Sequence, residues 1–316
     1  MQQISGIIGT PVTPFTPTGE IDEPVAGGMF KFLVDSRVHG IATPMHIGES
    51  INMSTDERKR LAEIAVEAVG GRVPVLINVS YTGSLVAADL ARHAAAIGAN
   101  GLVCLPPYHW APPPAGILAH FQTVAAATDL PMVIYNSPKL GVTITGELLR
   151  EIITTIPNVV GMKDASFNIR YVTESVRVGE RARPGFSIFS GIDYPLPTMA
   201  VGGRGTFSLF AQLVPRLAVR LYERCAAGDF VGAKVDQQNI DEMWGVVRSG
   251  YASGVKAALA VMGRPVGPSR LPVVPYSSEQ VERLAAAMAE LRFLADEPRG
   301  WNVHDTSAAP APAGVR

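Results

Sequence analysis

The sequence has few cysteines, few charged residues and no long apolar run. Its 316 residues include only Cys104 and Cys225, too few for a disulfide framework and without the spacing of a cysteine-bound metal. The 27 Lys and Arg residues nearly balance the 28 Asp and Glu residues, which predicts no surface for nucleic acid or an acidic membrane. No apolar run approaches the roughly 18 residues that span a bilayer, and Met1-Gln2-Gln3 does not open a signal peptide. These absences predict a cytoplasmic protein without membrane or nucleic-acid partners.

Apolar residues, by contrast, are plentiful. They make up 47% of the chain, while charged residues make up only 17%. A chain of 316 residues can bury a large core, as one large domain or as one domain with an appendage. The apolar excess indicates that further surface is buried between the subunits of an oligomer.

No pattern of histidine and acidic residues indicates a metal site or a glycosidase. The histidines are scattered at positions 39, 46, 93, 109, 120 and 304. None forms an H-x-x-x-H pair or stands in a carboxylate cluster, which disfavours a metal-dependent aldolase. No carboxylate pair suits glycoside hydrolysis. The sequence therefore predicts chemistry without a metal.

Short apolar segments alternate with amphipathic ones along most of the chain. Strands are expected at 4–11, 41–45, 73–79, 101–105, 132–135, 159–163, 187–190 and 205–209. Helices are expected between them, at 23–36, 54–70, 84–97, 114–127, 145–156 and 169–178, with a short one ending at 201. The helix at 54–70 opens with the capping box Ser54-Thr55-Asp56-Glu57 and ends at Gly70-Gly71.

Strands that each lead into a helix predict an α/β fold, a (β/α)8 TIM barrel. A doubly wound open sheet is the alternative, but Gly9-Thr10-Pro11 after the first strand is no G-x-G-x-x-G turn. Further helices at 214–227, 230–248, 254–262 and 278–296 predict a C-terminal helical extension. The expected domains are a barrel at 1–226, a helical domain at 227–296 and a flexible Pro/Ala/Gly-rich tail at 297–316.

The residues that could do chemistry stand where expected strands end, which is the active-site face of such a barrel. Lys163 ends the apolar run Val159-Val160-Gly161-Met162, and Tyr135 ends the preceding strand. A lysine at a strand end often only reaches solvent, but an uncharged amine is a nucleophile toward carbonyl carbon. One lysine, one phenol and small polar donors suit imine chemistry on a 2-oxo acid. The lysine would form the Schiff base, the phenol would move protons, and backbone N–H groups would hold the carboxylate.

Several segments match one enzyme family. They are GIIGTPVTPF at 6–15, Gly48-Glu49-Ser50, Pro106-Pro107-Tyr108, Tyr135-Asn136-x-Pro138 and Gly161-x-Lys163-Asp164. Over about residues 4–295 the chain resembles the dihydrodipicolinate synthase / N-acetylneuraminate lyase family. The resemblance implies a (β/α)8 barrel with a C-terminal helical domain, usually a homotetramer, and implies no prosthetic group. It also implies that Lys163 forms the imine, that Tyr135 is the proton shuttle, and that Ser190, Gly191 and Phe207 line the bound acid.

The chain departs from this family in the segment that usually binds the carboxylate and relays protons. His46-Ile47 replaces two hydroxyl residues there. Ile47 offers no side-chain donor, so the backbone N–H groups of Ile47 and Gly48 are left to hold the carboxylate. His46 is either a general acid or base, with an ionisation between about pH 6 and 7.5, or a structural residue at a strand end. Glu49 is expected to accept N–H groups of its own loop.

Two further departures concern the second substrate. His109 replaces a tyrosine that follows Tyr108 in the synthases, and with Trp110 it either packs at a subunit contact or touches substrate. Tyr108 and His109 are therefore candidate substrate-binding residues. The synthases' arginine after Tyr-Asn-x-Pro is missing from Lys139-Leu140-Gly141. This disfavours the lysine-pathway synthase.

The sequence therefore predicts a Schiff-base lyase or aldolase that acts on pyruvate or a related 2-oxo acid. The synthase proper, a dehydratase or hydratase-aldolase, and a deaminase remain alternatives, because all start from the same imine. A non-catalytic sensor of 2-oxo acids is the alternative of another class. The intact pair of Lys163 and Tyr135 disfavours it, because binding alone does not need that chemistry.

Overall fold

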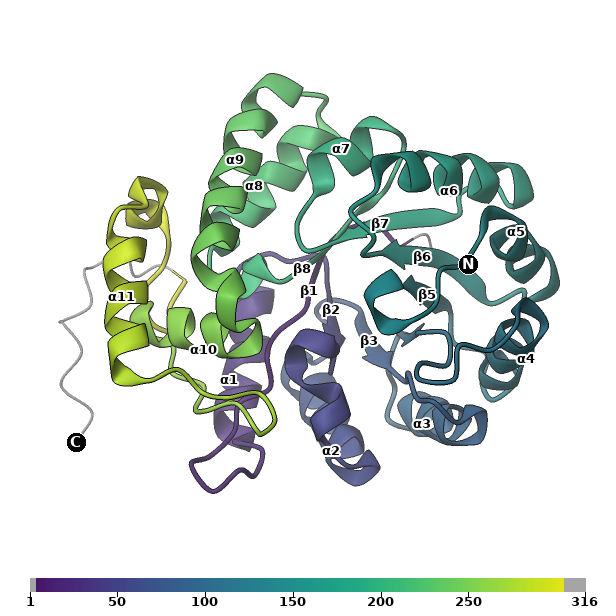
Figure 1. Ribbon diagram of the computed structural model, residues 1–316, viewed down its shortest axis with the longest axis horizontal. Coiled ribbons are helices and arrows are strands. Elements are labelled where there is room, and N and C mark those ends of the chain that lie inside the picture. Colours follow the sequence, from purple (N-terminus) through teal and green to yellow (C-terminus); the bar gives the residue numbers. More distant parts are fainter. Residues whose placement is uncertain (1–3, 304–316) are drawn as a thin grey trace.

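Eight parallel strands form a closed barrel in the computed structural model, which describes residues 4–303. They follow one another around the barrel in chain order, and β8 pairs with β1 (Figure 1). The strands are β1 (Gly6–Gly9), β2 (Gly40–Thr43), β3 (Val75–Asn78), β4 (Gly101–Cys104), β5 (Met132–Asn136), β6 (Val159–Asp164), β7 (Ser187–Gly191) and β8 (Gly205–Ser208). The predicted barrel is confirmed, and the closed order excludes the open sheet.

Helices follow the strands and surround the barrel. They are α1 (Glu23–Asp35), α2 (Thr55–Val69), α3 (Ser84–Ala96), α4 (Pro114–Ala125), α5 (Gly146–Thr155), α6 (Ile169–Ala182), α7 (Pro195–Ala200) and α8 (Pro215–Ala226). The capping box of α2 is present, since Ser54 Oγ accepts the Glu57 N–H and the Glu57 carboxylate accepts the Ser54 N–H. Gly70 then ends this helix with a φ of 58°.

Alternate residues of each strand pack on opposite sides of the barrel wall. Ile7 and Ile41 face outward, where they join the core between strands and helices. Ile8, Leu76 and Phe207 face inward and belong to a second core cluster, which also contains side chains of the C-terminal helices. This alternation determines which residues at the strand ends point into the barrel and which point toward the helices.

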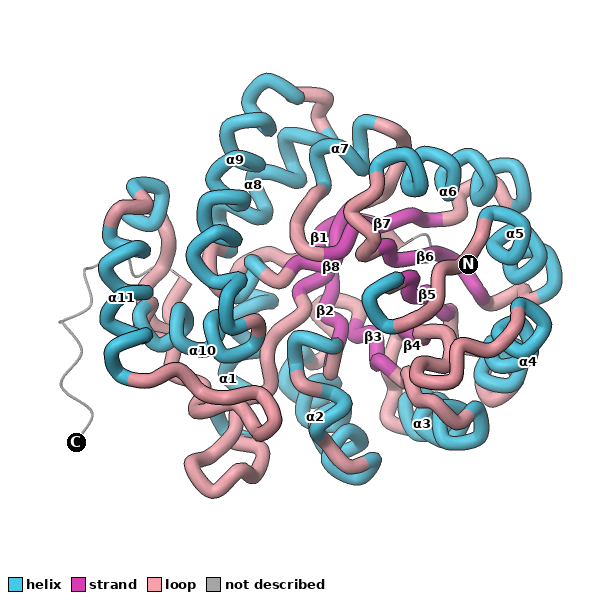
Figure 2. Tube along the Cα trace, in the orientation of Figure 1, coloured by secondary structure: helices cyan, strands magenta, loops and turns pink. Residues whose placement is uncertain are grey.

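The C-terminal helices lie to one side of the barrel. They are α9 (Phe230–Val247), α10 (Ala252–Val261) and α11 (Ser278–Ala289), and Figure 2 shows α11 outside the ring of helices that encloses the strands. The sequence predicts one helix over 278–296. The structure instead has α11 and a separate short helix, η6 (Arg292–Asp296), because Leu291 takes an extended conformation between them.

The first residues after 296 pack against the barrel helices. Glu297 is buried and accepts the backbone N–H groups of Arg216 and Leu217, and Trp301 packs edge-on against Phe32. Burial raises the pKa of Glu297 to about 7. The remainder of the predicted tail, 304–316, lies outside the described residues, and the domain boundaries at 226 and 296 stay a prediction.

No helix within residues 4–303 is long and apolar enough to cross a membrane. The same residues hold no cluster of His, Cys, Asp or Glu that could bind a metal ion. Cys104 and Cys225 are free and buried, and burial raises the pKa of the Cys104 thiol to about 12. Cys104 is thus a core residue of β4 and not a nucleophile.

Candidate active site

Lys163 and Tyr135 lie side by side at the carboxyl ends of β6 and β5. The strand register pairs them, and both are 6% exposed. The Lys163 Nζ lies 3.8 Å from the centroid of the Tyr135 ring and 5.5 Å from that of Phe207. Within the described part of the chain, Lys163 makes no ion pair. The amine therefore faces aromatic rings in a buried site and not a carboxylate.

The next residues on the same two strands form a second pair on the outer side of the barrel. Asn136 Nδ2 donates to Asp164 Oδ1 at 2.7 Å, and the Ser166 hydroxyl donates to Asp164 Oδ2 at 2.6 Å. Burial raises the pKa of the Asp164 carboxyl, and the hydrogen bonds from Ser166 and Asn136 oppose this shift. The outer pair fixes the register that brings Lys163 beside Tyr135.

The short helix η1 (His46–Gly48) after β2 forms another wall of the site. His46 and Ile47 line a cavity of about 30 Å³ together with Lys163 and Tyr135. Burial, and secondarily the charge of Lys163, lowers the pKa of His46 from its ordinary value near 6.5. The ionisation expected between pH 6 and 7.5 therefore moves below 6.5, and His46 is neutral at pH 7.

Gly48 sits where a side chain has little room. A Cβ there would lie 3.1 Å from the Pro11 carbonyl oxygen, and the Thr13 hydroxyl donates to the Gly48 carbonyl at 2.6 Å. The Gly48 N–H donates to the Met45 carbonyl at 2.9 Å. Of the two amides expected to hold a carboxylate, that of Gly48 is thus already engaged.

A second cavity, of about 120 Å³, shares His46 and Tyr135 with the first. Its other lining residues are Ser50, Ile51, Asn78, Ser80, Leu105, Tyr108 and Leu140. The buried Arg58 fixes this wall, because its guanidinium donates to the carbonyls of Asn78 at 2.6 Å and Ser80 at 2.9 Å. Tyr108 lines this cavity, and the Thr82 hydroxyl donates to its carbonyl at 3.1 Å. Burial raises the pKa of the Tyr108 phenol.

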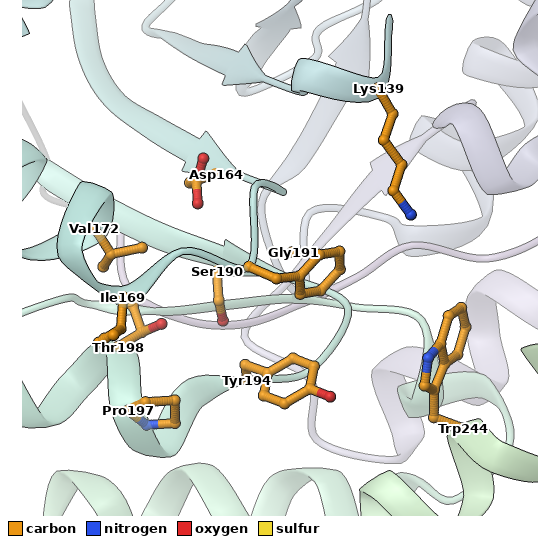
Figure 3. Close-up of a pocket in the computed structure, with 11 residues that line it drawn as sticks. Lys139, Asp164, Ile169, Val172, Ser190, Gly191, Tyr194, Pro197, Thr198 and Trp244 are labelled. Carbon is orange, nitrogen blue, oxygen red and sulfur yellow. The ribbon is translucent and has the colours of Figure 1, made fainter. Parts of the chain in front are cut away.

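The structure separates the three residues expected to line the bound acid. Phe207 lines the cavity at Lys163. Gly191 lies beside the lysine, since a Cβ on Gly191 would be 3.0 Å from Lys163 Cε, and it also lines the outer cavity that Ser190 faces. Ser190 faces outward instead, into a different cavity of about 340 Å³ beside α6, α7 and α9 (Figure 3). Its hydroxyl is buried and has no hydrogen-bond partner among the described residues.

The loop after β7 is held by Asp193. The Asp193 carboxylate accepts the Ser208 hydroxyl and, at 3.1 Å, the Phe210 N–H. Gln237 of α9 donates to the Asp193 carbonyl at 2.8 Å. Burial raises the pKa of Asp193 to about 6. The Asp193 carboxylate thus links the loop after β7 to Ser208 at the end of β8 and to Phe210. The neighbouring Ile192 lines the cavity at Lys163.

His109 and Lys139 do not reach the lysine cavity. His109 is exposed and packs against Trp110, with ring centroids 5.0 Å apart. Lys139 is also exposed, and its amine lies 5.9 Å from the centroid of the Phe167 ring. Both residues line the outer cavity, in which Figure 3 labels Lys139. The position after Tyr-Asn-x-Pro therefore places no cation beside Lys163.

Tyr251 is a site residue that sequence reasoning missed. It lines the cavity at Lys163 from the start of α10, and its ring centroid lies 5.7 Å from that of His46. Burial, and secondarily Tyr135, raises the pKa of its phenol. The sequence carries no signal for it, because Tyr251 stands between two helices of the extension, far along the chain from every strand.

A closed (β/α)8 barrel with a buried lysine and a tyrosine at adjacent strand ends defines a barrel enzyme of the lysine-dependent lyase class. Residues 3–291 match the model of the dihydrodipicolinate synthetase family. The chain belongs to this family.

Two curated relatives illustrate its range. The chain is 32% identical over 286 residues to the probable 2-dehydro-3-deoxy-D-pentonate aldolase YjhH of Escherichia coli K12, covering 89% of this chain and 95% of the relative. It is 34% identical over 286 residues to the 4-hydroxy-tetrahydrodipicolinate synthase of Symbiobacterium thermophilum, covering 90% and 96%. These relatives share about the same identity with the chain and carry different activities.

A similar solved structure is YagE, a prophage protein of the dihydrodipicolinic acid synthase family from E. coli K12, in complex with pyruvate. It superposes with a TM-score of 0.88 at 27% identity, over 92% of this chain and 99% of YagE. The chain is therefore a carbon–carbon lyase of the class I, pyruvate-dependent kind.

Proposed function

We propose that the chain is an aldolase that cleaves a 4-hydroxy-2-oxo acid into pyruvate and a small neutral aldehyde, or joins the two. The observation that carries this proposal is the buried pair of Lys163 and Tyr135, with Nζ 3.8 Å from the ring centroid. A lysine amine and a positioned phenol are the groups that imine formation on a ketone requires.

In the proposed reaction the Lys163 amine adds to the C2 carbonyl and expels water to form an imine. The C3–C4 bond then breaks and its electrons move toward the imine nitrogen. A base removes the proton of the C4 hydroxyl, so that C4 leaves as an aldehyde. The resulting enamine takes a proton at C3, and water releases pyruvate from Lys163.

Tyr135 is the proposed proton carrier at the imine, because its ring contacts the lysine. His46 is the proposed base for the C4 hydroxyl. It lines both the lysine cavity and the neighbouring 120 Å³ cavity, and it is neutral at pH 7 because its pKa is lowered. Tyr251 faces His46 across the lysine cavity and would contact the same part of the substrate.

The character of the two cavities supports a neutral aldehyde. Of the described residues that line them, Lys163 alone is cationic, and the other polar groups are hydroxyls, an amide and an imidazole. A substrate with a second carboxylate would be buried there without a cation, which is costly. This favours a hydroxyaldehyde, in line with the pentonate aldolase named among the relatives, over an aldehyde that carries a second carboxylate.

The experiment compares two reactions of the purified protein. One is release of pyruvate from 2-dehydro-3-deoxy-pentonate, measured with lactate dehydrogenase and NADH; the other is condensation of pyruvate with aspartate semialdehyde. We expect the first to proceed and to be lost in Lys163→Arg, and the second to be slower by two orders of magnitude or more. Faster condensation would instead support the synthase, for which the synthases at about 30% identity provide the precedent.

A further inference from the structure

Glu49 connects the segment that carries His46 to the C-terminal helices. It follows η1 directly, and its backbone is in the left-handed region with a φ of 57°. The residue is only 2% exposed, and its Oε1 lies 2.8 Å from the Nζ of Lys256 on α10. Its Oε2 accepts the backbone N–H of Arg270 at 2.9 Å. The expectation that the Glu49 carboxylate accepts N–H groups of its own loop is thus corrected: apart from the Asn52 side chain, its partners lie more than 200 residues away.

Lys256 is buried to a similar degree as Glu49. It is 4% exposed, its Nζ donates to the Pro268 carbonyl at 2.9 Å, and the Phe15 ring centroid lies 4.4 Å away. The Arg270 guanidinium covers the same ring at 4.1 Å. Lys256 and Arg270 therefore both contact Glu49, and both cations pack on the Phe15 ring.

The helix that supplies Lys256 also supplies Tyr251. Tyr251 is the residue before α10, and Lys256 lies within its first two turns. Tyr251 has φ 48° and ψ −116°, a conformation that is strained for a residue with a Cβ and persists only where its surroundings enforce it. One rigid element thus contacts the His46 segment at two points, through Tyr251 at His46 and through Lys256 at Glu49.

We propose that Glu49 and Lys256 are positioning residues for the lyase reaction. Their ion pair locks η1 and α10 together, which holds His46, Ile47 and Tyr251 around the Lys163 amine. The C-terminal helical extension is then part of the active site and not a separate appendage. This inference rests on the proposed imine chemistry of Lys163.

Electrostatics support the pairing. Burial lowers the pKa of Lys256 to about 8, Glu49 opposes this shift, and Arg270 adds to it. Glu49 is therefore the group that keeps the ammonium charged at pH 7. Removing one partner leaves the other buried without its counter-charge, whereas the double variant removes both members of the pair. The double variant should therefore be less destabilised than the singles.

The experiment compares Glu49→Gln, Lys256→Met and the double variant with wild type. A matched control is Lys59→Met, which breaks the partly exposed ion pair between Lys59 and Asp89 (2.7 Å) on the outer helices. Two quantities are measured at pH 7: stability by urea unfolding, and the rate of borohydride trapping of pyruvate on Lys163 as a function of pyruvate concentration.

We expect the half-saturating pyruvate concentration to rise about 10- to 100-fold in both single variants and to stay raised in the double variant, although its stability recovers. Lys59→Met should match wild type. A double variant that regains wild-type half-saturation together with stability would overturn the proposal, and so would single variants that fold and bind pyruvate normally. If wild type itself is not trapped, the imine chemistry fails, whatever the variants do.

Discussion

Adjacent residues of one strand have opposite relations to the active site, as Ser190 and Gly191 show. Side chains alternate along β7, so Phe189 faces the barrel interior and Ser190 faces the helices. Gly191 lines the same outer cavity as Ser190, but it also lies next to the lysine, since a Cβ on Gly191 would be 3.0 Å from Lys163 Cε. The family resemblance implies that both residues line the bound acid. In the structure Gly191 lies beside Lys163, whereas the Ser190 side chain points away from it.

Substitutions at these two positions should differ in their effect. Gly191→Ala places a methyl group 3.0 Å from Lys163 Cε, which displaces the amine and should slow pyruvate trapping about 100-fold. Ser190→Ala removes a hydroxyl that points away from the amine and should leave trapping within about twofold. Trapping rates with pyruvate and borohydride measure both, and circular dichroism checks the fold. Equal losses in the two variants would contradict the placement of Ser190.

His46 can be identified from the sequence, but its pKa depends on its surroundings in the folded protein. An imidazole has an ordinary pKa near 6.5, but here burial and the Lys163 ammonium both disfavour its charged form. The neutral ring can accept a proton throughout the neutral range. Below its lowered pKa the ring is protonated and cannot act as a base.

Turnover should therefore fall as the pH drops through a value below 6.5, and this acidic limb should be absent in His46→Asn. The variant should also lose about 10²- to 10⁴-fold in turnover at pH 7, the usual contribution of a general base. Trapping of pyruvate on Lys163 should persist, because imine formation needs the lysine and Tyr135. A pH–rate profile of the variant that keeps both the limb and the rate would make His46 a structural residue.

At the scale of elements, the barrel could be predicted from the sequence. Each strand is a short apolar run, turns and capping residues mark the helix ends, and Lys163 and Tyr135 end consecutive strands. Parallel strands place their carboxyl ends on one face, so the pairing of these two residues follows from the fold. The strand register that makes them neighbours is also visible in Asn136 and Asp164, the next residue on each strand.

The residues that the C-terminal extension contributes to the candidate active site could not be predicted from the sequence. Tyr251 lines the cavity at Lys163 although it belongs to the C-terminal extension, and its strained backbone has no local sequence signal. The sequence predicts that Glu49 contacts its own loop, but its carboxylate contacts Lys256 and Arg270. Contacts over such separations depend on tertiary packing, which periodicity along the chain does not report.

At the scale of the whole molecule, exposed apolar residues are consistent with an oligomer, but they do not give the number of its subunits. Trp110 is 73% exposed in the loop that follows β4, and Val231 of α9 is 84% exposed. Large apolar side chains on a surface mark sites of protein association when they are grouped. The homotetramer that the family resemblance implies remains a prediction.

Light scattering tests this prediction. At micromolar concentration we expect a particle with four times the chain mass of 33.5 kDa. Trp110→Ser should shift the distribution toward smaller species if the loop after β4 is at a contact, whereas a surface change such as Arg92→Ser should not. A wild-type protein that scatters as a monomer would exclude the tetramer.

The central claim is that Lys163 forms an imine with a 2-oxo acid, and one measurement tests it directly. The protein is incubated with pyruvate and sodium borohydride, and its intact mass and peptide map are determined by mass spectrometry. The account predicts one reduced pyruvyl group per chain, located on Lys163, and none in Lys163→Arg. An unchanged mass at saturating pyruvate, or a modification on another lysine, would contradict it.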